Sequence, residues 1–380
     1  MNFEFSEDQQ MLRDMARKFL SEQCPMPRVR QVFEGEQHHD AELWNAIAEM
    51  GWLGTAVEER FGGVGMGYLE LCVIAEEMGR HMAPVPFSSS VYLAIEGIKS
   101  AGSDEQKSRL LPQLTSGEVI GALAVSEGVG PVDASDVLSL KDGKLSGTKW
   151  PVLDGESADI LLVLAREDAG QSLFIVETKS DGLTKSSLAS LDPSRSQSRF
   201  DFDNVSAERL GAPGAGSHLI ERLYDRAAVL FAFEQLGSAQ VTLEIGVEHA
   251  KNRYAFGRPI GSFQAIKNKL ADMFVLTELA RSNCYYGAWA LSNDAPELGV
   301  AAANARVSAT QTAYQCVKES LQIHGGMGFT WEANCHLYYR RAKLLSLAIG
   351  GERVWKNKLI DRLQVERNST SKDESDRAAA

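Results

Sequence analysis

The sequence predicts an α+β protein in which a small antiparallel β domain lies between two helical regions. Apolar residues recur at helical spacing up to about residue 118, short alternating stretches follow from 119 to 213, and long helical patterns return from 214 to 364. A chain of 380 residues also exceeds the usual size of a single hydrophobic core, so several packed regions are expected.

The N-terminal region, residues 1–118, is predicted to be helical. Its first helix carries Leu12, Met15 and Phe19 on one stripe. A glycine-rich loop at residues 58–65 separates two helical patterns. Because no Lys-Ser or Lys-Thr pair follows its glycines, we interpret the loop as a turn between helices rather than as a phosphate-binding loop.

Five strands are predicted in the β domain, residues 119–213. Residues 199–203 alternate strictly between polar and apolar side chains, as a half-buried strand does. Asp-Gly pairs at 142–143 and 181–182 supply turns. The predicted strands cover residues 119–125, 144–150, 160–165, 172–177 and 198–205.

Residues 214–364 are predicted to form a four-helix bundle. The four helical patterns cover residues 219–252, 274–290, 296–324 and 334–363. Residues 365–380 are polar and lack apolar periodicity, which predicts a disordered tail.

Composition argues against several classes of partner. The chain carries 39 Lys and Arg against 51 Asp and Glu, and this net charge of −12 disfavours nucleic acid or an anionic membrane. The acidic N-terminus does not match a signal peptide, and no apolar run approaches the length of a membrane span. The five cysteines are scattered without metal-ligand spacing, so we expect no metal site, no disulfide framework and a cytoplasmic location.

A compact turn rich in glycine and proline, residues 256–261, separates two of the predicted helices. Arg253, Arg258 and Gln264 surround it as directional polar groups. Donors of this kind suit a pyrophosphate or a carboxylate. From the residues alone, ordinary surface salt bridges explain them equally well.

Together with the stretch QIHGGMGF at residues 322–329, this turn resembles the acyl-CoA dehydrogenase family of flavoenzymes. The resemblance covers residues 1–364 and implies the family's fold: an N-terminal helical domain, a middle β domain and a C-terminal four-helix bundle. It also implies FAD as cofactor, an acyl-CoA thioester as substrate, a tetramer, and an electron-transferring flavoprotein as acceptor. The reaction requires that the protein binds the flavin, polarises the thioester carbonyl and places a carboxylate at Cα.

In the family, two motifs of a neighbouring subunit hold the adenine and pyrophosphate end of FAD; we call them the clamp. Arg253, Phe256 and Gln264 match the motif Arg-x-x-Phe-Gly…Phe-Gln. A second motif, Gln-x-x-Gly-Gly-x-Gly, offers bare backbone to a phosphate. A tight turn between helices is the alternative explanation of its paired glycines. This second motif is matched by Gln322, Gly325, Gly326 and Gly328.

The part that the family uses for the flavin ring is matched poorly. Residues 126–133, SEGVGPVD, replace TEPGAGSD, and Ser126 still offers a hydroxyl to the ring. Residues 151–155, PVLDG, replace Trp-Ile-Thr-Asn-Gly and lose the stacking indole and the threonine hydroxyl. Trp150 is adjacent, but one step along a strand reverses the face of a side chain.

The family's catalytic carboxylate is absent from both of its usual positions, which hold Ile349 and Ala227. Glu234 is the candidate for a relocated base, on the same helix face as Ala227 but about 10 Å further along. Its alternative role is a buried acid in a contact between helices. Glu352 follows Ile349 by three residues and is better explained as a solvated partner of a nearby cation.

The chain keeps the clamp motifs but has an altered flavin-ring loop and lacks the base at its usual positions. In this combination it resembles the smaller, partner subunit of α₂β₂ acyl-CoA dehydrogenases, the kind used on steroid side-chain CoA thioesters. In this hypothesis a homologous dehydrogenase subunit supplies the base while this chain clamps FAD. Three alternatives stay open. They are a self-sufficient homotetramer that uses Glu234, a flavin oxidase or monooxygenase of the same fold, and a flavin-free assembly scaffold.

Overall fold

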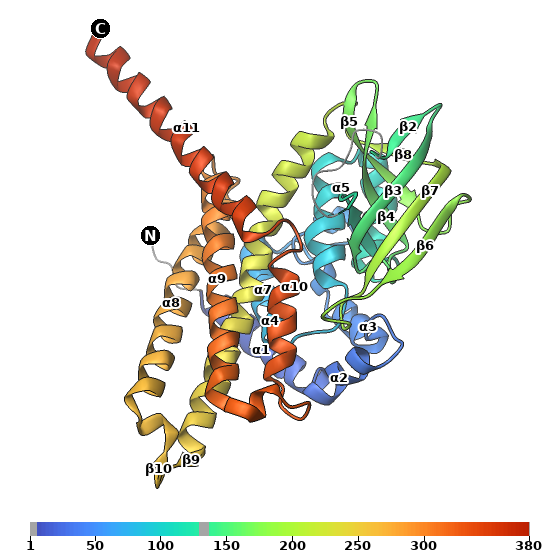
Figure 1. Cartoon of the computed structure of the whole chain (residues 1–380). Coiled ribbons are helices and arrows are strands. Elements are labelled where there is room, and N and C mark those ends of the chain that lie inside the picture. Colours follow the sequence, from blue (N-terminus) through green and yellow to red (C-terminus); the bar gives the residue numbers. More distant parts are fainter. Residues whose placement is uncertain (1–5, 129–136, 380) are drawn as a thin grey trace. The chain divides into compact units, whose positions relative to one another are not determined.

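The computed structural model describes residues 6–128 and 137–379, with side chains described as far as residue 365 (Figure 1). The chain divides into two compact units, one formed by Glu7–Ala227 and the other beginning at Ala228. The long helix α7 (Gly216–Asn252) contributes residues to both units.

The first unit begins with helices whose ends are fixed by polar side chains. Asp40 accepts a hydrogen bond from the backbone N–H of Leu43 at 3.0 Å and so caps α3. Ser103 and Gln106 form a capping box at the start of α6. The helices are α1 (Glu7–Gln23), α2 (Met26–Glu34), α3 (Ala41–Glu49), α4 (Tyr68–Arg80), α5 (Glu96–Ala101) and α6 (Asp104–Thr115).

The same unit contains a sheet whose strands are ordered β6-β7-β3-β2-β4-β5-β8, with β1 also paired to β4. Its core is built from alternate strand residues such as Leu161, Val163 and Phe200, all fully buried. The strands are β1 (Gly121–Ala124), β2 (Ser139–Lys141), β3 (Lys144–Leu153), β4 (Ile160–Glu167), β5 (Gly170–Glu177), β6 (Leu183–Leu188), β7 (Gln197–Ser206) and β8 (Glu208–Leu210).

The five predicted strands are present, but the sheet is mixed rather than purely antiparallel. Strands β1 and β2 each run parallel to β4, while the other pairs are antiparallel. Strands β2, β6 and β8 were not predicted. Strand β6 is an edge strand with no fully buried side chain, so it lacks the apolar alternation by which strands are recognised.

A buried ion pair joins the sheet to the π-helical segment η3 (Ser88–Ile95). Arg195, 1% exposed, donates through Nε to Asp154 Oδ1 at 2.8 Å and through Nη2 to Ser88 Oγ at 2.5 Å. Ser89 also donates to Asp154. Because a buried charge without a partner is costly, this network fixes the end of β3 against η3.

In the second unit, the C-terminal part of α7 packs against α8 (Gln264–Ser292) and α9 (Leu298–His324), and α10 (Cys335–Leu345) packs against α9. The long helix predicted over 219–252 is confirmed as part of α7. The helix predicted over 334–363 is wrong as a single element. A turn at 346–351 divides it into α10 and α11, and Gly350 in that turn has a φ of 101°, which favours glycine.

Helix α11 runs from Glu352 to Ala379 and so differs from the disordered tail predicted over 365–380. In this segment Glu, Lys, Arg and Ala are about as frequent as Ser, Thr, Asn and Asp, so helix propensity alone does not explain the extension.

Candidate functional site

The first clamp motif forms a β-hairpin after α7, made of β9 (Tyr254–Ala255) and β10 (Arg258–Pro259). Its two turn residues, Phe256 and Gly257, have φ values of 54° and 79°, the signature of a tight hairpin turn. Phe256 is 95% exposed, and Arg253 and Gln264 are also exposed. The hairpin therefore presents its predicted binding groups outward.

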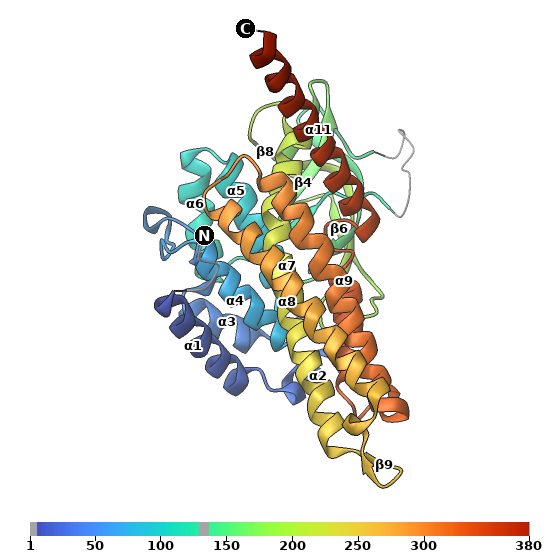
Figure 2. The ribbon, with the colours of Figure 1, turned by 90° about the vertical axis from the view of Figure 1, so that its left-hand side faces the viewer.

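The second clamp motif lies at the same end of the bundle as the hairpin, where α9 ends and turns towards α10 (Figure 2). Gln322 is exposed on the last turn of α9. A Cβ atom added at Gly325 or Gly326 would meet nothing within 4 Å, so their backbone is open to a ligand. At Gly328 a Cβ would lie 2.6 Å from the Leu321 carbonyl oxygen, so this glycine is required by packing.

The two motifs are brought together by a contact that the sequence did not reveal. His249 of α7 and His324 of α9 stack with ring centroids 4.0 Å apart. Arg258 lies over the Phe263 ring at 4.1 Å, which leaves its charge at the surface of the hairpin. Exposed basic groups and open glycine backbone suit the anionic end of a dinucleotide such as FAD.

Ser126 is exposed at the end of β1, while residues 129–136 of the predicted ring loop lie outside the described residues. The root of this loop is held by a buried ion pair. Lys149 Nζ lies 2.5 Å from Glu127 Oε1 and donates to the Val125 carbonyl oxygen at 3.0 Å. Glu127 Oε1 also accepts the Leu138 N–H at 3.0 Å, so one carboxylate holds both ends of the loop. Burial lowers the pKa of Lys149, and Glu127 opposes this shift.

Trp150 lies in a part of β3 that does not follow simple alternation. Strand β3 carries one extra residue between its pairings Lys149↔Phe200 and Val152↔Ser198, a β-bulge that breaks the alternation. The Trp150 N–H donates to the Ser126 carbonyl oxygen at 2.9 Å. A Cβ at Gly128 would lie 3.6 Å from the Trp150 ring, so the indole lies against this loop.

The two positions to which the resemblance assigns the catalytic base are buried and apolar: Ile349 is 2% exposed and Ala227 is 0% exposed. Glu352 pairs with Lys356 at 2.6 Å and accepts from Gln311 at 2.7 Å. These two hydrogen bonds lower its pKa, as expected of a partner of a surface cation.

Glu234 is 4% exposed and lies in the interior of the bundle unit. The neighbouring Gln235 accepts hydrogen bonds from Arg306 Nη1 at 2.6 Å and from Thr310 at 3.0 Å. Burial lowers the pKa of Arg306 to about 9, and the negative charge of Glu234 opposes that shift. The charge of Glu234 therefore favours the charged form of the buried Arg306 side chain. This agrees with the alternative role of Glu234 as a buried acid between helices.

A buried cluster of four titratable side chains was missed by the sequence analysis. Tyr68 donates to Glu96 at 2.8 Å, Lys99 lies 3.2 Å from the same carboxylate, and Arg226 donates to it at 2.5 Å. Although burial acts to raise the pKa of Glu96, the two cations and the hydrogen bonds hold it below its ordinary value. The sequence shows only the Glu96 and Lys99 pair, three residues apart on α5, whereas Tyr68 and Arg226 come from distant segments.

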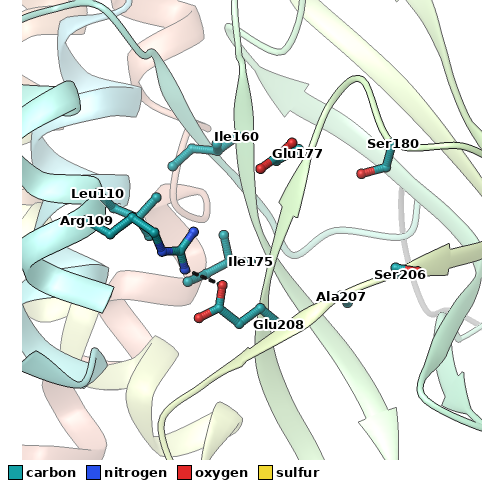
Figure 3. A pocket seen from close by; sticks show the side chains of 9 residues that line it. All are labelled: Arg109, Leu110, Ile160, Ile175, Glu177, Ser180, Ser206, Ala207 and Glu208. Atoms are coloured by element: carbon teal, nitrogen blue, oxygen red, sulfur yellow. Dashed lines mark hydrogen bonds and ion pairs between the residues drawn. The ribbon is translucent and has the colours of Figure 1, made fainter. Parts of the chain in front are cut away.

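A cavity of about 310 Å³ opens between α6 and the β4, β5 and β8 strands (Figure 3). Arg109 reaches into it and is paired with Glu208, while Glu177 adds a second carboxylate. Two carboxylates and one neutralised cation do not suit an anionic CoA thioester. None of the predicted site residues lines it. Its lining is Arg109, Leu110, Ile160, Ile175, Glu177, Ser180, Ser206, Ala207 and Glu208.

Among the described residues, no three His, Cys, Asp or Glu side chains gather as metal ligands would. No helix in the described part of the chain has the length and hydropathy needed to cross a membrane.

Comparison with known proteins identifies the family. Family models described as the acyl-CoA dehydrogenase N-terminal and C-terminal domains match residues 6–118 and 214–364. The acyl-CoA dehydrogenase IpdE2 of Mycobacterium tuberculosis is 30% identical over 88% of this chain and 91% of its own length.

Two solved structures share the fold. Butyryl-CoA dehydrogenase from Megasphaera elsdenii superposes with a TM-score of 0.89 at 28% identity, over 96% of this chain and 100% of that chain. A chain of the ChsE4-ChsE5 complex from Mycobacterium tuberculosis gives 0.88 at 27% identity, over 96% and 99%. The chain therefore belongs to the acyl-CoA dehydrogenase family of FAD-dependent oxidoreductases that act on a CH–CH bond.

Proposed function

We propose that this chain is the partner subunit of an α₂β₂ acyl-CoA dehydrogenase, in which it clamps FAD across the subunit interface. A homologous subunit then contributes the carboxylate that removes the Cα proton of the acyl-CoA. An electron-transferring flavoprotein is the acceptor, and the complex works in the cytoplasm, where the five buried free cysteines stay reduced.

One observation carries this proposal: the groups for the cofactor's nucleotide end face outward, while the positions for the base are closed. Arg253, Gln264 and Gln322 are exposed, so they are available to a cofactor bound mainly by another subunit. Ile349 and Ala227 are buried hydrocarbon side chains that take up no proton. A chain that offers groups for the nucleotide end of FAD but no base complements a subunit that has the base.

The roles of the chain's own residues follow from their chemistry. Arg253 would pair with a phosphate oxygen, Gln322 would donate through its amide, and the open backbone at Gly325 and Gly326 would let a phosphate approach closely. When bound, FAD supplies the acceptor for the hydride that leaves Cβ. Ser126 would donate to the ring, with Trp150 beside it.

The test is co-expression with a homologous dehydrogenase subunit, followed by anaerobic titration with acyl-CoA. We expect bleaching of the flavin absorbance in the complex and none with this chain alone. Arg253→Met in this chain should lower the FAD content of the complex severalfold, whereas Arg353→Met, an exposed arginine elsewhere in the same unit, should leave it unchanged. Bleaching by the chain alone would contradict the proposal.

A self-sufficient homotetramer with Glu234 as base is the second candidate, favoured by the burial of this acid near Arg306. Glu234→Gln separates the two functions because it keeps the shape and removes the base. We expect the variant complex to bleach at the rate of the unmodified one and to lose stability. A loss of bleaching by two orders of magnitude or more would instead identify Glu234 as the base.

A further inference from the structure

The stacked pair of His249 and His324 joins the two halves of the clamp. Their ring planes are inclined by 25° with centroids 4.0 Å apart. His249 lies in the last turn of α7 and its carbonyl oxygen accepts the Arg253 N–H at 2.9 Å. His324 is the last residue of α9 and directly precedes Gly325. Each imidazole is therefore attached to one of the two motifs.

Hydrogen bonding sets the protonation of one ring. His324 Nδ1 lies 2.7 Å from the Ser320 carbonyl oxygen, which only accepts, so Nδ1 carries the hydrogen. Its Nε2 is then the ring nitrogen without a hydrogen.

The charges that act on His249 are all of one sign. Partial burial lowers its pKa, and His324 and Arg253 lower it further, with no acidic group of the described residues acting in the opposite direction. On the helices packed against this turn, Lys269 of α8 and Glu319 of α9 are paired with each other. A proton added to His249 thus meets the positive charge of Arg253 until an anion binds.

The backbone beside the pair leaves room for such an anion. Gly325 is held at φ 60° and ψ −139°, a conformation that is essentially restricted to glycine. At Gly325 and Gly326 no described atom lies within 4 Å of the point that a Cβ would occupy, so this surface stays uncovered by the described part of the chain.

We infer that His249, stacked on His324 and next to Arg253, forms a proton-linked binding site for a diphosphate, and that His249 takes up a proton from solvent when the diphosphate binds. The inference rests on the proposed function, because it identifies the diphosphate with that of FAD. No covalent bond changes: the proton moves from water to an imidazole nitrogen, and the site gains one positive charge opposite the anion.

This linkage fixes the sign of the pH dependence. An anion next to the pair favours the charged imidazole, so affinity rises as the pH falls, by up to about tenfold per pH unit for one linked proton. We expect ADP to bind severalfold more tightly at pH 6 than at pH 8. Guanidinium groups do not titrate between pH 6 and pH 8, so a site built from arginine alone would show almost no such slope beyond the ionisation of ADP itself.

The experiment is isothermal titration of the full chain with ADP and with inorganic pyrophosphate, in buffers that differ in ionisation enthalpy. After correction for the probes' own protons, we expect net proton uptake at pH 7 that His249→Asn abolishes. His38→Asn, at a 49% exposed histidine of the other unit, should keep the uptake.

Binding without net proton uptake would overturn the inference and leave the clamp intact. The same holds if His249→Asn takes up as many protons as the unmodified chain. Failure of both probes to bind would overturn the inference and the clamp together. The measurements on the unmodified chain need no variant, so the inference is testable even where the asparagine variant does not fold.

Discussion

At the scale of single residues, the clamp glycines serve different purposes although the sequence presents them as one motif. Gly328 is required because its backbone lies against the Leu321 carbonyl oxygen. Gly325 adopts a glycine-only conformation, and Gly326 has neither restriction. Only at Gly326 does a methyl group test the ligand contact without disturbing the fold.

We therefore expect Gly326→Ala to lower the FAD content of the complex while changing the free energy of unfolding by less than about 0.5 kcal/mol. The added methyl group meets no described atom of the chain but would stand between the backbone and a phosphate. FAD per chain and a denaturation curve measure the two effects. Gly351→Ala, whose methyl group would make an ordinary contact at 3.6 Å, is the matched control. Full FAD retention in the Gly326 variant would contradict this role.

At the scale of elements, the ends of helices and strands are decided by contacts that local patterns do not contain. The bulge in β3 depends on its pairing with β7, and the break between α10 and α11 depends on the turn around Gly350. In the buried cluster of four titratable side chains, Glu96 of α5 likewise joins α4 through Tyr68 and α7 through Arg226, both distant in the sequence.

Glu96 gives this cluster a defined pH dependence. Its pKa in the folded chain lies below the ordinary value of 4.5, so it contributes stability above pH 4.5 and loses that contribution as the pH falls through the folded-state pKa. Glu96→Gln leaves Arg226 and Lys99 without their anion and should cost about 3–5 kcal/mol at pH 7. Urea denaturation at several pH values should show the difference from the unmodified chain shrinking in acid.

Glu352→Gln is the control for this measurement. Its ion pair with Lys356 is exposed to solvent, so its loss should cost less than about 1 kcal/mol. Equal losses for Glu96→Gln at pH 7 and in acid would show that the Glu96 charge is not the source of the stability.

At the scale of the whole molecule, the second unit leaves apolar side chains exposed on α8. Phe274, Val275 and Leu279 are 56%, 54% and 58% exposed. An exposed apolar patch of this kind marks a surface that another subunit covers. A chain that clamps FAD across an interface needs such a neighbour.

The double variant Phe274→Ser, Leu279→Ser should therefore shift the complex to smaller species and lower its FAD content in parallel. Sedimentation measures the mass, and absorbance measures the flavin. Ile360→Ser, at a 54% exposed apolar residue of α11, is the control and should change neither. Intact mass with unchanged flavin in the double variant would exclude this face of α8 from the interface.

The sequence by itself determined the order of helical and β regions and the family, because these depend on local periodicity and on which side chain occupies a position. That the chain lacks a base of its own stays a prediction. The assignment of Arg253, Gln322 and the other clamp residues to FAD, and the limits of the domains, stay predictions. Only the tertiary structure decided that His249 meets His324, that Trp150 lies against Ser126, and that Glu234 acts on Arg306. The reason is physical: spacing along the chain fixes the face of a helix or strand, whereas the partner of that face is chosen by the packing of segments that are distant in the sequence.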